Sequence, residues 1–338
     1  MIQADCPGLS KGRLLLRTIC FIPVLALFVL AASCAKFAKV SDQSIPKLLT
    51  PIADAEFDQL TAKLRAFINV QAMRSSRVTI QFLDAESTER YRTADASLVL
   101  KRPDNIRLII QVPTVGTKIA EMVSDSQHFR VAIYRPEQYR SFLIGSNNAD
   151  YTQWRERLSK KAEQQSALVN ARPFHFTDAL LVHPLHLDEA KFIYSRQQEL
   201  IEEFDARKGA KPGARVLRSF YVISESELIP STPGRAKLRR RFWFDRNNQT
   251  QLSRQQVFDE QGRVVTDANY SNYLKLSAEG ADLWPSVIKI SRPYDKYSAV
   301  LTFLPESVEY NPADLPAAAF VLENKEKLPQ TDLDQLQP

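Results

Sequence analysis

The chain has 338 residues, of which 44% are hydrophobic, so it can bury a large core as one big domain or two small ones. Its formal net charge of +6 is mild for this length, and it therefore gives only weak evidence for an acidic partner.

The N-terminal segment has the three parts of a secretory signal in the usual order. Lys11, Arg13 and Arg17 supply positive charge, an uncharged run extends from Thr18 to Leu30, and small residues then lead to Cys34. The apolar run of about 13 residues is shorter than the roughly 20 that cross a bilayer. We therefore predict a signal peptide over residues 1–33. A secretory signal without lipidation and an uncleaved anchor remain open.

The sequence around Cys34 resembles the lipobox of bacterial lipoproteins, in which the cysteine is acylated and the bond before it is cut. Cys6 and Cys20 lie in the removed segment, so acylation would occupy the single remaining thiol. Each buried methylene contributes about 0.8 kcal/mol to membrane binding, and several chains anchor a protein firmly. Ala35, rather than Asp, implies by the same resemblance the inner leaflet of the outer membrane, facing the periplasm.

Residues 34–53 contain Pro46 and Pro51 with little periodicity, which predicts a lipidated tether. From Asp54 to Arg74 apolar residues then recur at helical spacing. Asp54 suits the N-terminus of this helix and Arg74 suits its C-terminus. The apolar positions of this predicted amphipathic helix are Phe57, Leu60, Leu64, Phe67 and Ile68.

Alternating apolar and polar residues predict strands after this helix. Residues 102–105, with a proline at the second position, predict a hairpin turn. The six strands expected here include Val78 to Phe82, Leu98 to Leu100, Ile106 to Ile110, and residues 118–125, 127–134 and 138–144.

Two helices, over Tyr151 to Leu168 and Pro173 to Val182, are expected next. Seven further strands follow them, and residues 259–262 form a turn in which Gly262 is free to take a positive φ. The polar, aperiodic residues 323–338 are expected to be disordered. The seven strands are expected at residues 191–204, 215–224, 237–245, 250–258, 263–276, 286–291 and 298–309.

The C-terminal half resembles the LolA/LolB-like superfamily. The resemblance rests on the strand segments 241–245, 252–255, 258–259, 262–264, 270–273, 284–285 and 288–290, on the hairpin 101–107 and on the closing segment 311–322. It covers residues 54–322. It implies a mainly antiparallel β fold, an incomplete and strongly curved barrel with helices plugging its mouth, and a hydrophobic cavity that takes acyl chains.

Binding of an acyl chain needs an apolar pocket rather than reactive groups, because each Å² of buried apolar area contributes about 25 cal/mol. No cofactor is expected. A packed core without ligand is the competing interpretation, since every sheet has an inner face. The predicted cavity lining is Val78, Ile80, Phe82, Leu98, Leu100, Leu108, Ile110, Phe129, Val131, Ile133, Phe242, Phe244, Ile288 and Ile290. Residues 112–116 and 228–230 are candidates for an exposed apolar loop that inserts into a membrane.

Other site hypotheses are weaker. His175, His183 and His186 are close in sequence, but Pro184 interrupts their spacing, so we expect no metal site. The cationic and aromatic run 235–243 is typical of a solvated strand face, with Arg239 and Arg241 outward, and export argues against a nucleic-acid partner. The sequence motifs of hydrolases, phosphate loops and zinc proteases are absent, so we do not expect an enzyme.

The sequence therefore predicts a membrane-tethered envelope lipoprotein that binds lipid or lipoprotein acyl chains, in lipoprotein or lipid localisation. The alternative is a structural or sensing lipoprotein that binds a protein partner in an envelope complex through the same fold.

Overall fold

The computed structural model describes residues 46–83, 93–147, 151, 170–186, 188, 190–276 and 283–336. The chain divides into a short unit, Met1–Lys47, and a large unit, Leu48–Pro338, and the fold concerns the large unit. The predicted signal peptide, Cys34 and the helix expected after Tyr151 lie outside the described residues. Within the described ranges, no helix is both long enough and apolar enough to span a membrane.

The large unit contains the predicted series of six and seven strands. The first six are β2 (Ala72–Phe82), β3 (Thr93–Lys101), β4 (Asn105–Gln111), β5 (Lys118–Ser124), β6 (His128–Ile133) and β7 (Ser141–Ser146). The next seven are β8 (Phe192–Phe204), β9 (Arg215–Leu228), β10 (Ala236–Asp245), β11 (Gln251–Phe258), β12 (Val264–Lys275), β13 (Leu283–Arg292) and β14 (Tyr297–Phe303). The helices are α2 (Phe57–Asn69) and α5 (Pro173–Leu180). Three short strands are β1 (Lys47–Leu48), β15 (Val308–Tyr310) and β16 (Gln330–Asp332). The 3-10 turns are η1 (Glu137–Tyr139), η2 (Arg246–Asn248), η3 (Pro305–Ser307), η4 (Ala317–Phe320) and η5 (Asp334–Leu336).

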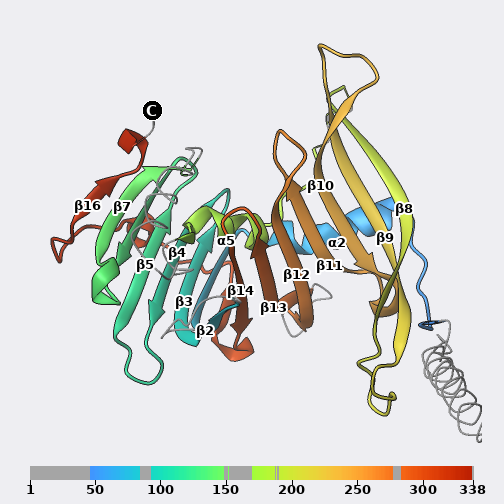
Figure 1. Ribbon diagram of the computed structural model, residues 1–338, viewed down its shortest axis with the longest axis horizontal. Coiled ribbons are helices and arrows are strands. Elements are labelled where there is room, and N and C mark those ends of the chain that lie inside the picture. The colour runs from blue at the N-terminus through green and yellow to red at the C-terminus, as the bar shows by residue number, and fades with distance from the viewer. Residues whose placement is uncertain are drawn as a thin grey trace, which may run out of the picture. The chain divides into compact units, whose positions relative to one another are not determined.

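All of these strands belong to one mixed sheet (Figure 1). The last of the seven strands, β14, pairs with the first of the six, β2, so the two series join in the middle of the sheet. The series then extend outward, to β8 beside β9 at one end and to β16 beside β7 at the other. The predicted β fold is therefore confirmed, and its sheet is not closed. The structure does not show helices plugging a mouth, since both helices pack against one face.

That face, called the inner face, carries the main apolar core. The strand side chains that alternate toward it form one buried cluster with the apolar side chains of α2 and α5. The opposite, outer face carries two smaller clusters, one around Val123 and Phe142 and one around Val222 and Trp243. The period-two alternation of the strands thus sorts most large apolar side chains onto one side of the sheet.

The first helix is shorter than predicted. It begins at Phe57 and ends at Asn69, because the side chain of Asn311 accepts the backbone N–H groups of Gln71 (2.7 Å) and Ala72 (3.0 Å) and turns the chain into β2. Arg74 consequently lies in a strand, where it pairs with Glu309 at 2.5 Å. The prediction of helix from 54 to 74 was wrong at both ends.

Part of the predicted tether belongs to the folded unit. Leu49 donates its backbone N–H to Leu217 at 2.9 Å, and Ala53 donates to Arg246 at 2.8 Å. Asp54, expected to cap the helix, instead accepts a hydrogen bond from Tyr221 at 2.8 Å and pairs with Arg246. The chain after residue 47 is therefore held along β9 and η2 rather than free.

The C-terminal segment is ordered in the structure, contrary to the prediction of disorder from residue 323. Gln330–Asp332 form β16, which pairs in parallel with β7. Leu328 and Leu333 are buried, with 4% and 1% of their surface exposed. These two leucines anchor a segment whose other side chains are mostly polar.

Candidate functional site

The predicted cavity residues all lie together on the inner face. None of the fourteen has more than 2% of its surface exposed, and all belong to the same buried cluster. The structure therefore brings together every residue that the alternation placed on this face. Neighbouring side chains, including those of α2 and α5, pack against these fourteen residues and bury them.

Helix α2 covers the part of the inner face formed by β11 and β13. Its buried side chains, Leu60, Leu64 and Phe67, have at most 1% of their surface exposed, while Asp58, Gln59 and Arg65 face solvent. The Phe67 ring lies between two aromatic rings of the sheet, 5.5 Å from Tyr270 and 5.0 Å from Trp284. An amphipathic helix with three apolar anchors thus closes this region.

Trp284, beneath α2, carries a buried polar atom that lacks a partner. The residue is 1% exposed, and no acceptor among the described residues lies within hydrogen-bonding distance of its Nε1. A buried N–H group without an acceptor costs about 1–3 kcal/mol. Trp284 is therefore a buried donor on the apolar face under α2 that has no acceptor among the described residues.

Helix α5 is held on the same face by buried polar contacts. Tyr270 donates from its hydroxyl to the carbonyl of Ala179 at 2.8 Å. The Asp178 carboxylate accepts hydrogen bonds from Thr266 (3.1 Å) and Arg292 (3.3 Å). Because most of α5 is buried and its polar groups are bonded to β12 and β13, the helix behaves as part of the core.

Arg102 joins the two helices to the sheet. It lies in the predicted hairpin turn between β3 and β4, which the structure confirms. Its guanidinium donates to the carbonyls of Phe67 (2.7 Å) and Val70 (3.0 Å) at the end of α2, and to Val182 (3.0 Å) just after α5. Burial lowers the pKa of Arg102, partly offset by the nearby Asp104 charge.

At the other end of α2, the Asp54–Arg246 pair precedes the helix, and the ties of the helix itself are exposed. Glu56, which precedes the helix, pairs with Arg196 of β8 at 2.9 Å, and the Glu56 side chain is 82% exposed. The Gln59 side chain accepts the Glu56 backbone N–H at 2.8 Å. Exposed ion pairs of this kind contribute about 0–1 kcal/mol. The N-terminal half of α2 therefore depends mainly on its apolar anchors.

The two candidate insertion loops differ in exposure. Val115, at the tip of the β4–β5 turn, has 70% of its surface exposed. Leu228 and Ile229 are half-buried, at the start of the turn between β9 and β10. The first loop therefore presents the side chain of Val115 to solvent, whereas in the second only Pro230 is exposed.

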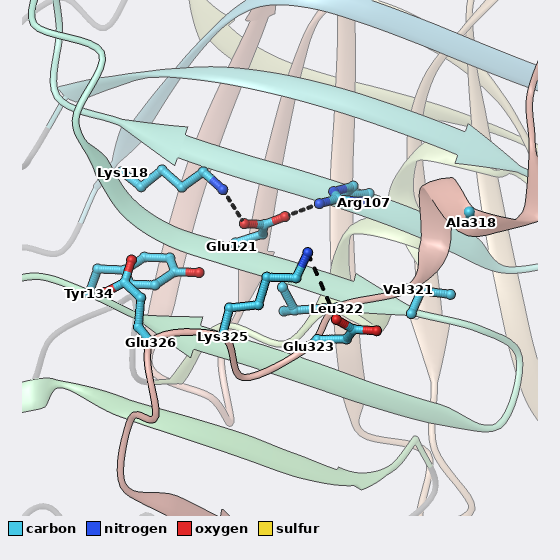
Figure 2. Close-up of a pocket in the computed structure, with 10 residues that line it drawn as sticks. All are labelled: Arg107, Lys118, Glu121, Tyr134, Ala318, Val321, Leu322, Glu323, Lys325 and Glu326. Atoms are coloured by element: carbon cyan, nitrogen blue, oxygen red, sulfur yellow. Dashed lines mark hydrogen bonds and ion pairs between the residues drawn. The ribbon is translucent and has the colours of Figure 1, made fainter.

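The outer face of β4 and β5 is covered by the C-terminal segment, with a hollow of about 450 Å³ between them (Figure 2). At its floor Glu121, 1% exposed, accepts from Lys118 at 2.7 Å and pairs with Arg107. Burial raises the pKa of Glu121, but the two cations outweigh that effect and hold the pKa below its ordinary value. Glu323 and Lys325 pair with each other within the C-terminal segment at 3.8 Å (Figure 2).

These charges are matched within the chain. The hollow is lined by three bases and three acids, and Arg107 also donates to the carbonyl of Ala319 at 3.0 Å. The arrangement fastens the C-terminal segment to β4 and β5. We therefore assign it a structural role.

The histidine cluster and the cationic run of the sequence analysis take part in separate contacts. His175 lies near Asp295 (3.5 Å), His183 near Asp104 (3.2 Å) and His186 near Glu225 (3.0 Å). The three histidines thus contact three different carboxylates. In the cationic run, Arg239 and Arg241 lie on the outer face as predicted. Arg240 is buried against Glu225 at 2.7 Å, an ion pair that the sequence analysis missed.

Comparison with known proteins gave no matching family model and no match among curated proteins. Among solved structures, the chain is similar to a LolA superfamily protein from Nitrosomonas europaea, with 13% identity, a TM-score of 0.41 and coverage of 78% of this chain and 97% of that chain. It is also similar to a DUF1329 family protein from Desulfovibrio piger, with 14% identity, a TM-score of 0.42 and coverage of 78% and 94%. Likeness at this level says nothing about what the chain binds.

Two residues of the candidate site were not predicted from the sequence. Trp284 was noted only as part of a strand signature, and Arg102 only as part of a turn. Each acts across a long sequence separation, Trp284 on α2 and Arg102 on two helices. The only sequence signals were a tryptophan at a strand start and an arginine beside Pro103.

Proposed function

We propose that this chain is an envelope lipoprotein that binds the acyl chains of a lipid or lipoprotein on the inner face of its sheet, beneath α2. The observation that carries the proposal is the Trp284 Nε1–H, which is buried under an amphipathic helix and has no acceptor among the residues that the structure describes. An ester carbonyl of a diacyl lipid is an acceptor on an otherwise apolar molecule. It would satisfy this donor while its acyl chains contact the surrounding apolar residues.

In this proposal α2 is the lid. Leu60, Leu64 and Phe67 occupy the inner face when no lipid is bound. An acyl chain that replaces them gains about 25 cal/mol per Å² of apolar area removed from water, so the exchange of one apolar occupant for another is close to balanced. A near-balanced exchange allows both loading and release, which a carrier or acceptor requires.

Membrane tethering through Cys34 would keep the site beside a membrane, and the exposed Val115 loop would contact the bilayer surface. A tethered protein is poorly suited to cross the periplasm. We therefore propose an acceptor-like role at the inner leaflet of the outer membrane rather than that of a soluble shuttle.

Native mass spectrometry of the full chain, released from membranes in detergent, tests lipid binding. We expect a lipid-sized adduct that survives detergent removal in the gas phase. A bare chain after incubation with diacyl lipid would contradict the proposal.

The second candidate is a structural or sensing lipoprotein that binds a protein partner. The filled inner face favours it, because all fourteen predicted lining residues are buried by the chain's own side chains. Under this candidate the same mass spectrum shows the bare chain.

A further inference from the structure

The strand β8 forms one end of the sheet and has one free edge. Its thirteen residues pair with β9 from Phe192 to Phe204, and it has no other strand partner in the part of the chain that the structure describes. An edge strand presents unpaired backbone N–H and C=O groups, which are a template for another strand.

Exposed apolar side chains are concentrated on this strand. Ile193, Leu200 and Phe204 have 48%, 51% and 66% of their surface exposed. They are three of the seven exposed large hydrophobic residues found among the described residues. An edge of this length with apolar side chains at both ends is unusual for a surface that stays free in solution.

At the other end of the sheet, the edge of β7 is covered. There the chain's own β16 covers the edge of β7, and Asp334 accepts the backbone N–H of Ser146 at 2.8 Å. Within the described residues, the chain thus covers the edge of β7 with β16 and leaves the edge of β8 uncovered.

The charges on β8 are arranged to match an antiparallel copy of the same strand. Arg196 lies in its first half, and three glutamates lie in its second half, Glu199, Glu202 and Glu203, of which Glu199 already accepts from Trp243. A parallel copy would place cation beside cation and acid beside acid. An antiparallel copy brings each Arg196 to the acidic half of the other strand, and it does so twice because of the two-fold symmetry.

We propose that β8 pairs with β8 of a second copy of this chain, antiparallel and about a two-fold axis near Gln198, so that one sheet continues through both molecules. In this register Phe192 faces Phe204 of the other copy, and Tyr194 faces its Glu202. Arg196 lies diagonal to that glutamate, within reach of a long side chain. The present partners of these ions, Glu56 for Arg196 and Arg215 for Glu202, lie on exposed rims and can be shared.

Co-capture of two differently tagged full chains, co-expressed and solubilised in detergent, tests this pairing. We expect the wild-type chains to capture each other. Two chains that both carry Arg196→Glu, or both Glu202→Arg, place like charges together and should lose co-capture by about tenfold or more. Mixing one Arg196→Glu chain with one Glu202→Arg chain restores two opposite-charge contacts and should restore co-capture.

The matched control is Arg130→Glu, an exposed charge reversal on β6, which should leave co-capture unchanged. The proposal is overturned if wild-type chains do not capture each other, if all variants do so equally, or if the mixed pair is not restored. Because recovery requires both variants to be folded, loss of folding cannot imitate the expected result. Capture of a different protein through β8, without a second copy, would also overturn it.

Discussion

Helices α2 and α5 cover the same apolar face by different means. In α5 the polar groups are bonded to the sheet beneath it, through Tyr270, Thr266 and Arg292. In α2 the polar side chains face solvent, and its polar ties lie at its two ends. Arg102 holds the carbonyls of Phe67 and Val70 at the C-terminal end. At the N-terminal end, Asp54 pairs with Arg246 before the helix, and Glu56 forms an exposed ion pair with Arg196. Both helices have comparable apolar anchors. The helices differ in where they are bonded, since α5 is bonded to the sheet through Asp178 and Ala179 within the helix and α2 is bonded at its ends. This difference is the basis on which we propose α2 as the lid.

This difference has a physical basis. Removing a helix from an apolar face can be offset by an acyl chain that takes its place, because the apolar contact is not specific in direction. A buried hydrogen bond has no such substitute in a hydrocarbon chain, and breaking it leaves an unsatisfied group. We therefore propose that an apolar ligand displaces the middle of α2, which rests on apolar contacts, more easily than it displaces α5.

The largest effect is expected from Arg102→Ala, which removes the tie shared by both helices. Three carbonyls lose a charged donor, so we expect the free energy of unfolding to fall by about 2–4 kcal/mol. Urea denaturation measures this change. The neighbouring exposed Lys101→Ala should stay within about 0.5 kcal/mol of the wild type. Equal effects of the two substitutions would show that Arg102 does not hold the helices.

Tyr270→Phe tests the attachment of α5 to the sheet. It leaves the Ala179 carbonyl buried without its donor, and we expect a loss of about 1–2 kcal/mol in the free energy of unfolding. Lipid uptake, followed by stopped-flow fluorescence with a labelled diacyl lipid, should keep its wild-type rate because α5 is not the lid. Faster lipid uptake by this variant would indicate that α5, rather than α2, is the lid.

Glu56→Gln tests the N-terminal attachment of α2. It should have the smallest effect on the free energy of unfolding, below about 0.5 kcal/mol, because the ion pair of Glu56 with Arg196 is exposed. Loss of the pair should nevertheless speed lipid uptake by about twofold, since it acts directly on the lid. High salt, which screens the pair, should bring the wild-type rate to that of the variant. An unchanged rate in low salt would mean that the N-terminal end of α2 does not open.

The sequence was sufficient to predict the strands and the side chains that they direct toward the inner face. Alternation in Val78, Ile80 and Phe82, and again in Ile288 and Ile290, decides which side chains point inward, and this is a local property. Helix α5 was also predicted to within two residues, because Pro173 fixes its first turn.

The contacts that control the face could not be read from the sequence. The end of α2 depends on Asn311, which is 240 residues from Gln71 in sequence. The order of the C-terminal segment depends on two leucines in a polar stretch and on Glu121, a glutamate within an apolar strand. Local sequence patterns do not identify such distant partners, so the contacts that hold α2 and the strand β16 were found only in the structure.

The central claim is that an acyl lipid binds beneath α2 with an acceptor at Trp284. Native mass spectrometry of the full chain loaded with a diacyl lipid, compared with Trp284→Phe, tests it most directly. The matched control is Trp243→Phe, on the outer face, whose Nε1–H already donates to Glu199 at 2.9 Å. We predict a weaker lipid adduct in Trp284→Phe only. Equal adducts in all three chains, or the same loss in both variants, would contradict the account.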